Sequence, residues 1–261
     1  MKKILLPLIA GVLATCFAHA QESAKDLAAK LSALQQDGNS FVRLKLDVKP
    51  ANGGKYALQL QIKQRRTAKS SEVVYQILWP KERAGEAVLL RQSGNQAPSG
   101  SVFTLPNTVR ELNASQMKEG LFGSDISYAD VLENFFAWDS QTIVGTEVVD
   151  RVNCQILESR PGKGQRASYP IVRTWVDSRR MVPMRVEKYL SPSAVARRID
   201  TTDVASDDMG RSIPANMMVS SPQKGSSTEV NGSKIRHGVA LTDRDFSPEG
   251  VRDLSTPKAA Q

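Results

Sequence analysis

Apolar and polar residues alternate along most of the chain. In residues 41–48, FVRLKLDV, every second position is apolar, and the positions between them carry Arg43, Lys45 and Asp47. Residues 55–64, KYALQLQIKQ, repeat the pattern after a turn at residues 50–54, PANGG. A period of two is typical of a strand with one buried face, and a short Gly-rich connection joins two such strands as a hairpin. Continued to Thr242, the pattern predicts about eleven strands in a long antiparallel meander, the last of them at residues 235–242.

Three segments break this alternation and predict helices. The first covers residues 22–36 with Ser23 as its cap, the second lies within residues 113–136, and the third lies near residues 248–254. Apolar residues make one side of the sheet hydrophobic along nearly every strand, and these helices are the only elements left to cover it. A twisted sheet of this size curls, and short helices rarely fill its concave side, so a cavity is expected.

The middle helix has the strongest local pattern. Ser127 followed by Asp130 fits a capping box, which predicts a helix from Tyr128 to Phe136. Its apolar residues recur three or four positions apart and form one stripe: Tyr128, Val131, Leu132, Phe135 and Phe136. The other positions are expected to face water: Ala129, Asp130, Glu133 and Asn134. On the pattern alone, core packing is favoured over ligand contact for this stripe, because aromatic stripes usually belong to a core.

The amino-terminal residues predict export. Lys2 and Lys3 precede an apolar run, and Ala18-His19-Ala20 offers small residues where a signal peptidase cuts. We therefore expect a signal peptide over residues 1–20, a single domain over residues 21–261 with a frayed tail at 255–261, and a location in the periplasm. Cys16 lies in a sequence similar to a lipoprotein box, and a lipid-anchored form is the alternative.

Composition argues against most kinds of chemistry. The formal net charge of +8 is spread over many strands and has no basic-aromatic platform, so no nucleic-acid partner is expected. Cleavage after Ala20 would leave Cys154 as the single cysteine and His237 as the single histidine. Cys154 is interpreted as a buried, inert strand thiol and His237 as a partnered strand residue. The paired carboxylates Asp207 and Asp208 are interpreted as part of a solvated turn. We expect no catalytic residue, no metal site and no cofactor.

Two motifs resemble a known family. The stretch GSDISYADV, residues 123–131, is similar to a signature of the LolA-like outer-membrane lipoprotein-sorting proteins, and residues 173–199 are similar to a second mark of that family. The resemblance implies a mainly β (α+β) fold: a strongly curved, unclosed antiparallel sheet with short helices plugging its concave face. It also implies an apolar cavity that holds acyl chains. Residues 127–136 would then be a plug that tilts about a hinge at residues 120–125 to admit a chain.

The predicted function is that of a carrier, not an enzyme. It would shield lipid or lipoprotein acyl chains in the cavity during transport toward the outer membrane, as a monomer. Predicted ligand contacts are the inward strand positions and the helix stripe: Leu44, Leu46, Leu58, Leu60, Tyr75, Ile77, Trp79, Leu89, Phe103, Tyr128, Val131, Leu132, Phe135, Phe136, Met184 and Met217. Two alternatives stay open on the same fold. One is a lipid-sensing regulator, and the other is an accessory subunit that docks on an inner-membrane exporter.

Overall fold

The computed structural model describes residues 23–94 and 96–253. The predicted signal peptide, Cys16 and the carboxyl-terminal tail lie outside the described residues. Among the residues described, no helix is both long enough and apolar enough to cross a membrane.

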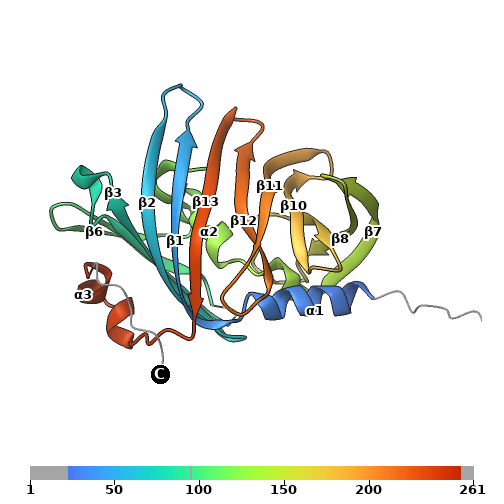
Figure 1. Ribbon diagram of the computed structural model, residues 1–261, viewed down its shortest axis with the longest axis horizontal. Helices are drawn as coiled ribbons and strands as arrows, with labels where there is room; N and C mark the ends of the chain where they lie inside the picture. The colour runs from blue at the N-terminus through green and yellow to red at the C-terminus, as the bar shows by residue number, and fades with distance from the viewer. Residues whose placement is uncertain (1–22, 95, 254–261) are drawn as a thin grey trace, which may run out of the picture.

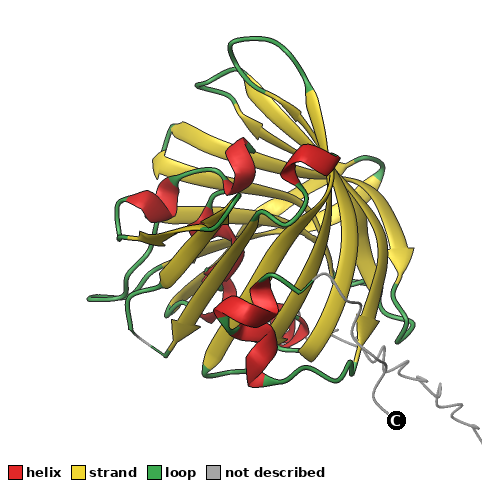
Figure 2. Ribbon diagram, turned by 90° about the vertical axis from the view of Figure 1, so that its left-hand side faces the viewer, coloured by secondary structure: helices red, strands yellow, loops and turns green. Residues whose placement is uncertain are grey.

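A single antiparallel sheet of thirteen strands dominates the molecule (Figure 1). Its strands are β1 (Gly38–Lys49), β2 (Tyr56–Arg66), β3 (Ser70–Trp79), β4 (Ala87–Ser93), β5 (Ser99–Thr104), β6 (Thr108–Leu112), β7 (Ser140–Val149), β8 (Val152–Arg160), β9 (Ile171–Asp177), β10 (Val182–Ser191), β11 (Ala194–Ser206), β12 (Ser212–Ser221) and β13 (Ser226–His237). The sheet is strongly curved and is not closed on itself, which confirms the predicted fold class (Figure 2).

The first and the last strand of the chain lie next to each other at the centre of the sheet. The strand order runs β6-β5-β4-β3-β2-β1-β13-β12-β11-β10-β9-β8-β7, so β1 pairs with β13, and β6 and β7 form the edges. The chain segment between these edges, residues 113–139, therefore has to cross from one side of the sheet to the other. We call residues 113–139 the plug segment.

Two details of the predicted meander were wrong. The strand β6 was not expected, and the last strand is Ser226–His237 instead of residues 235–242. The polar stretch before Lys234, which shows no apolar alternation, pairs with β1 on one side and β12 on the other. Hydrogen bonds to two neighbouring strands fix this segment as a strand despite its polar side chains, since the backbone groups are satisfied on both sides.

The helices are short. They are α1 (Ala24–Leu34), α2 (Tyr128–Leu132) and α3 (Pro248–Val251), with 3-10 turns η1 (Lys81–Arg83), η2 (Gln116–Lys118), η3 (Leu121–Gly123), η4 (Phe135–Ala137) and η5 (Asp243–Phe246). The Ser23 hydroxyl accepts a hydrogen bond from the Asp26 backbone N–H at 3.1 Å, which confirms the predicted cap of α1.

Both faces of the β2–β5 half of the sheet are covered. On one face, Val73, Val88 and Leu90 pack against α2 and the turns before it. Alternate residues of the same strands, which point to the other face, pack with Phe246 and Val251 of η5 and α3. The buried Lys63 ammonium lies 3.0 Å from the Asp245 carboxylate and fixes η5 to β2. This coverage explains why Ala87, Val88, Leu89 and Leu90 of β4 are all buried.

Candidate functional site

The plug segment is not one continuous helix beyond Ser127. The capping box is present, with Ser127 and Asp130 bonded as predicted, but α2 ends at Leu132. Glu133 has an extended backbone, with φ −75° and ψ 114°, and Phe135 begins a separate 3-10 turn. The predicted helix to Phe136 was therefore too long.

This break separates the aromatic stripe into two groups. Tyr128, Val131 and Leu132 pack with the strands of the β2–β5 half. Phe135 and Phe136 pack instead with α1 and with strands β8 to β10. The plug segment thus contributes to the cores of both halves of the sheet.

Asp125 fixes the plug segment to the centre of the sheet. Its carboxylate accepts hydrogen bonds from the hydroxyls of Ser221 at 2.7 Å, Ser226 at 2.5 Å and Thr228 at 3.0 Å. The Asp125 backbone N–H also donates to the Thr228 hydroxyl at 2.9 Å. Three donors on β12 and β13 satisfy one buried carboxylate, so the residues expected to act as a hinge carry an attachment point.

Asp130 fixes the plug segment to the other half. Its carboxylate lies 2.6 Å from Lys188 Nζ of β10 and forms a second ion pair with Arg197 of β11. Burial alone would raise the pKa of Asp130, but Lys188 and Arg197 hold this pKa well below its ordinary value. The expectation that Asp130 faces water was wrong, because its side chain is only 5% exposed.

Gly123 and Phe122 make a tight turn before α2. Both have positive φ angles, 86° and 53°. A Cβ at Gly123 would lie 2.6 Å from the Tyr56 hydroxyl, which donates a hydrogen bond to the Phe122 carbonyl at 3.0 Å. The glycine is therefore needed both for its backbone conformation and for the close approach of Tyr56.

A cavity of about 500 Å³ lies between the sheet and the plug segment. Its volume is within the range of roughly 300–1,000 Å³ typical of small-molecule sites. The lining is mostly apolar and comes from the end of α1, from β1, β2 and β3, from the plug segment and from β10 to β13. Its apolar residues are Leu34, Leu44, Leu46, Leu60, Tyr75, Leu121, Ile126, Val131, Phe135, Phe136, Val186, Ile199, Met217, Val219 and Val230. A second, polar part of the lining comprises Gln35, Asp37, Gln64, Arg66, Asp130, Glu133, Lys188 and Thr201.

The structure brings half of the predicted contact residues to this cavity. These are Leu44, Leu46, Leu60, Tyr75, Val131, Phe135, Phe136 and Met217. Leu58 and Ile77 are buried beside Leu46 and Leu60. Tyr128 and Leu132 lie in the cluster of α2 with the β2–β5 half.

The other four predicted residues lie elsewhere. Leu89 and Phe103 pack in the cluster with η5 and α3. Trp79 is 50% exposed, and Met184 packs with Cys154 and other residues in a separate cluster. The polar lining residues, above all Arg66 and Lys188, were not predicted. By alternation they share a strand face with Leu60 and Met184, which were predicted to point inward, but charged side chains were not expected in an apolar cavity.

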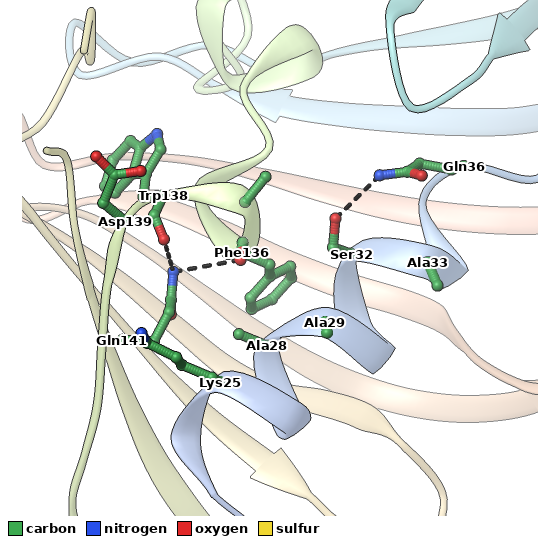
Figure 3. Close-up of a pocket in the computed structure, with 11 residues that line it drawn as sticks. Lys25, Ala28, Ala29, Ser32, Ala33, Gln36, Phe136, Trp138, Asp139 and Gln141 are labelled. Atoms are coloured by element: carbon green, nitrogen blue, oxygen red, sulfur yellow. Dashed lines mark hydrogen bonds between the residues drawn. The ribbon is translucent and has the colours of Figure 1, made fainter. Parts of the chain in front are cut away.

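A second hollow of about 350 Å³ lies outside the cavity, between α1 and η4 (Figure 3). The Gln141 side-chain amide donates to the carbonyls of Phe135 at 3.0 Å, Phe136 at 3.3 Å and Trp138 at 3.0 Å, which holds η4 in place. Phe136 lines this outer hollow as well as the cavity. Phe136 therefore borders both spaces.

A group of acidic residues and one histidine lies near the start of β1. Ligand atoms of Asp207, Asp208 and His237 lie within 4.8 Å of one another, close enough to hold a metal ion. Each already has a partner: Arg211 Nε donates to Asp207 at 2.8 Å, and the His237 ring contacts both Asp208 and, at 2.8 Å, Asp37. The Arg211 guanidinium supplies the positive charge in this group. Asp207 is buried, so the prediction of a solvated turn was wrong for this residue, while His237 is partnered as expected.

Cys154 is buried in β8 and has no cysteine partner within residues 23–94 and 96–253. Burial raises the pKa of its thiol from the ordinary value. Both findings agree with the inert thiol expected from the sequence.

Solved structures share this fold, a curved antiparallel sheet with a connecting segment against its concave face. The sheet is similar to a DUF1329 family protein from Desulfovibrio piger, with a TM-score of 0.79 and 20% identity over 87% of this chain and 97% of that chain. It is similar to a domain from Vibrio parahaemolyticus named for outer membrane lipoprotein sorting, with a TM-score of 0.77 and 18% identity over 88% of this chain and 98% of that one. A LolA superfamily protein from Nitrosomonas europaea has a TM-score of 0.69 and 14% identity over 88% of this chain and 100% of its own. The LolA-like fold predicted from the motifs is confirmed.

A family model described as "Uncharacterized protein" matches residues 69–253, and the chain belongs to that family. No curated protein matches the chain in sequence.

Proposed function

We propose that this protein is a periplasmic carrier that shields acyl chains of lipids or lipoproteins in the cavity between the sheet and the plug segment. The observation that carries the proposal is the cavity itself, a space of about 500 Å³ with a mainly apolar lining from both halves of the sheet. Exposing an acyl chain to water costs about 0.8 kcal/mol of free energy for each methylene group, so moving the chain between membranes requires an apolar cavity that covers it.

The fold supports the same role. The Vibrio parahaemolyticus domain with a similar fold is named for lipoprotein sorting. The lining also includes Met217, whose flexible side chain adapts to ligands of irregular shape. The carrier would work without catalysis, since its contacts with the ligand are apolar packing, and its partner in transport would be an inner-membrane exporter.

Native mass spectrometry of the protein purified from a bacterial periplasm tests the proposal. We expect a population with an added mass that tandem fragmentation identifies as a lipid or an acylated peptide. Purification without detergent followed by incubation with lipid vesicles gives a second arm, in which the empty protein should take up lipid. A protein that carries no added mass and takes up none from vesicles would overturn the carrier and leave the accessory-subunit alternative. A bound lipid whose addition releases a membrane partner would instead identify the regulator.

A further inference from the structure

Along β1 and β2 the lining of the cavity changes from apolar to polar residues. On β1 and β2 the apolar part includes Leu44, which pairs with Leu60. Six residues further along β2, Arg66 pairs with Gly38 at the α1 end of the sheet. At ~3.3 Å per residue this separates Leu60 from Arg66 by roughly 20 Å. The lining along β1 and β2 therefore becomes polar toward α1, which suits a molecule with an apolar part and a polar part.

Arg66 is the cation of the polar part whose charge no contact balances among the described residues. Its Nη2 donates to the Val131 carbonyl of the plug segment at 2.8 Å, and its Nε donates to the Gln64 side chain at 3.3 Å. Both acceptors are neutral, and among the described residues no carboxylate forms a salt bridge with Arg66. A guanidinium has five N–H donors, so donors remain for a further acceptor. Burial lowers the pKa of Arg66 from its ordinary value, as expected for a desolvated charge.

Three other ionisable groups of the lining, on Lys188, Asp130 and Asp37, already have partners. Lys188 is paired with Asp130 at 2.6 Å. Asp37 accepts from the His237 ring at 2.8 Å and from Arg211 at 3.4 Å.

Glu133 differs from these pairs, because no cation of the described residues forms a salt bridge with it. It accepts from the Ser168 backbone N–H at 2.7 Å through one oxygen, and its second oxygen is buried without a partner. Burial raises the pKa of Glu133, which favours its neutral form. Arg66 therefore remains as the cation that an anionic ligand would neutralise.

We infer that the cavity binds an amphiphile with a single acyl chain and one anionic headgroup, a carboxylate or a phosphate, with the headgroup on the Arg66 guanidinium. The chain then lies along Leu60, Leu44 and Met217 toward the centre of the sheet. A guanidinium matches the geometry of carboxylate and phosphate oxygens and binds them through two parallel hydrogen bonds. A volume of about 500 Å³ suits one chain better than the several chains of a complete lipoprotein anchor. This inference rests on the proposed carrier function and specifies its ligand.

Binding of matched ligands to the whole protein tests the inference. The probes are dodecanoate, dodecyl phosphate and the uncharged dodecanol, each titrated at pH 7.5 by displacement of a fluorescent apolar dye. Free acetate and inorganic phosphate test whether the headgroup binds without a chain. We expect the two anionic amphiphiles to bind about tenfold or more tightly than dodecanol, because a charge-assisted hydrogen bond in a desolvated site is worth that factor. We expect no binding of the free anions at the same concentrations.

Three variants separate a headgroup contact from a structural role. Arg66→Gln should reduce the affinity for dodecanoate about tenfold and leave the affinity for dodecanol unchanged, while Arg66→Lys should restore part of the loss. The control is Arg65→Gln, because Arg65 is the neighbouring arginine, pairs with Glu72 at 2.5 Å and does not line the cavity. It should leave both affinities unchanged.

Equal loss of dodecanoate and dodecanol binding in Arg66→Gln would overturn the inference, since Arg66 would then act only through its bond to the Val131 carbonyl. Equal affinities of the wild-type protein for the three amphiphiles would overturn it as well, while the carrier function would stand. If none of the three amphiphiles binds the folded protein, the carrier function itself fails.

Discussion

The ammonium group of Lys188 lies 2.6 Å from the carboxylate of Asp130, and the two side chains are only 2% and 5% exposed. This ion pair joins β10 to α2. Together with the bonds of Asp125 to β12 and β13, it attaches the plug segment to the sheet at two separate places. The motif GSDISYADV therefore supplies attachment points at its third and eighth residues, and these bonds oppose the simple tilting motion that the sequence suggested.

Replacing Asp130 by asparagine should strongly destabilise the protein. The change leaves Lys188 and Arg197 buried without their partner, which typically costs about 3–5 kcal/mol. The free energy of unfolding from urea titrations measures the effect. Asp47→Asn is the control, because Asp47 pairs with Lys45 at the surface, and such a pair contributes about 0–1 kcal/mol. Equal losses in the two variants would contradict the assigned role of Asp130.

The contribution of Asp130 should also depend on pH. Its pKa is lower in the folded protein than in the unfolded chain, so the unfolded chain takes up the proton first as the pH falls. The stabilisation is then fully present above the unfolded value of about 3.9 and is lost as the pH falls toward the folded value. Urea titrations of the wild type and Asp130→Asn should show a constant difference between pH 7 and 5 that shrinks below about pH 4. A difference independent of pH down to 3 would count against the ion pairs.

The Thr228 hydroxyl should stabilise the plug segment locally. Thr228→Val keeps the shape of the side chain and removes both hydrogen bonds to Asp125, at a cost of about 1–3 kcal/mol. Hydrogen exchange followed by mass spectrometry should show that residues 120–128 exchange faster in this variant than in the wild type, while exchange in the central strands changes less. The exposed Thr108 gives a control variant, Thr108→Val, which should leave exchange in residues 120–128 unchanged.

Filling the cavity should reduce its capacity for ligand. Met217→Trp introduces a larger side chain at the lining, and bound lipid in native mass spectra should fall several-fold, since occupied space excludes the chain. Met209→Trp is the matched control, because Met209 is 62% exposed and does not line the cavity. Unchanged lipid in a folded Met217→Trp protein would place the ligand elsewhere.

Removing the Phe136 ring should open a second path to the cavity. Phe136→Ala would connect the cavity with the outer hollow, and ligand should dissociate faster, as stopped-flow dye displacement would measure. The loss of a buried aromatic ring also costs about 3–5 kcal/mol, so the melting temperature is measured in parallel. Lys25→Ala changes an exposed residue that lines the outer hollow and does not line the cavity, and it should leave the dissociation rate unchanged.

The sequence predicted the sheet and the capping box well because both depend on local patterns. The alternation in residues 41–48 and the spacing of Ser127 and Asp130 each fix a structure within a few residues. It could not predict the surroundings of Asp130, because its partners Lys188 and Arg197 are distant in sequence. The cavity lining was only half predicted, for a different reason. Leu89 lies within an apolar run, AVLL at residues 87–90, in which both faces are buried, and the pattern does not say which face meets the plug segment.

The pairing of β1 with β13 has a consequence for how the chain acquires its shape. Strands β1 to β6 and β7 to β12 can form from hairpins between sequence neighbours, but the seam between these halves needs residues 226–237. Contacts between segments so far apart form slowly, because a long loop must close first. The cavity walls meet only at that step, so a chain that passes through a membrane unfolded, amino terminus first, could not trap a lipid until nearly all of it had crossed.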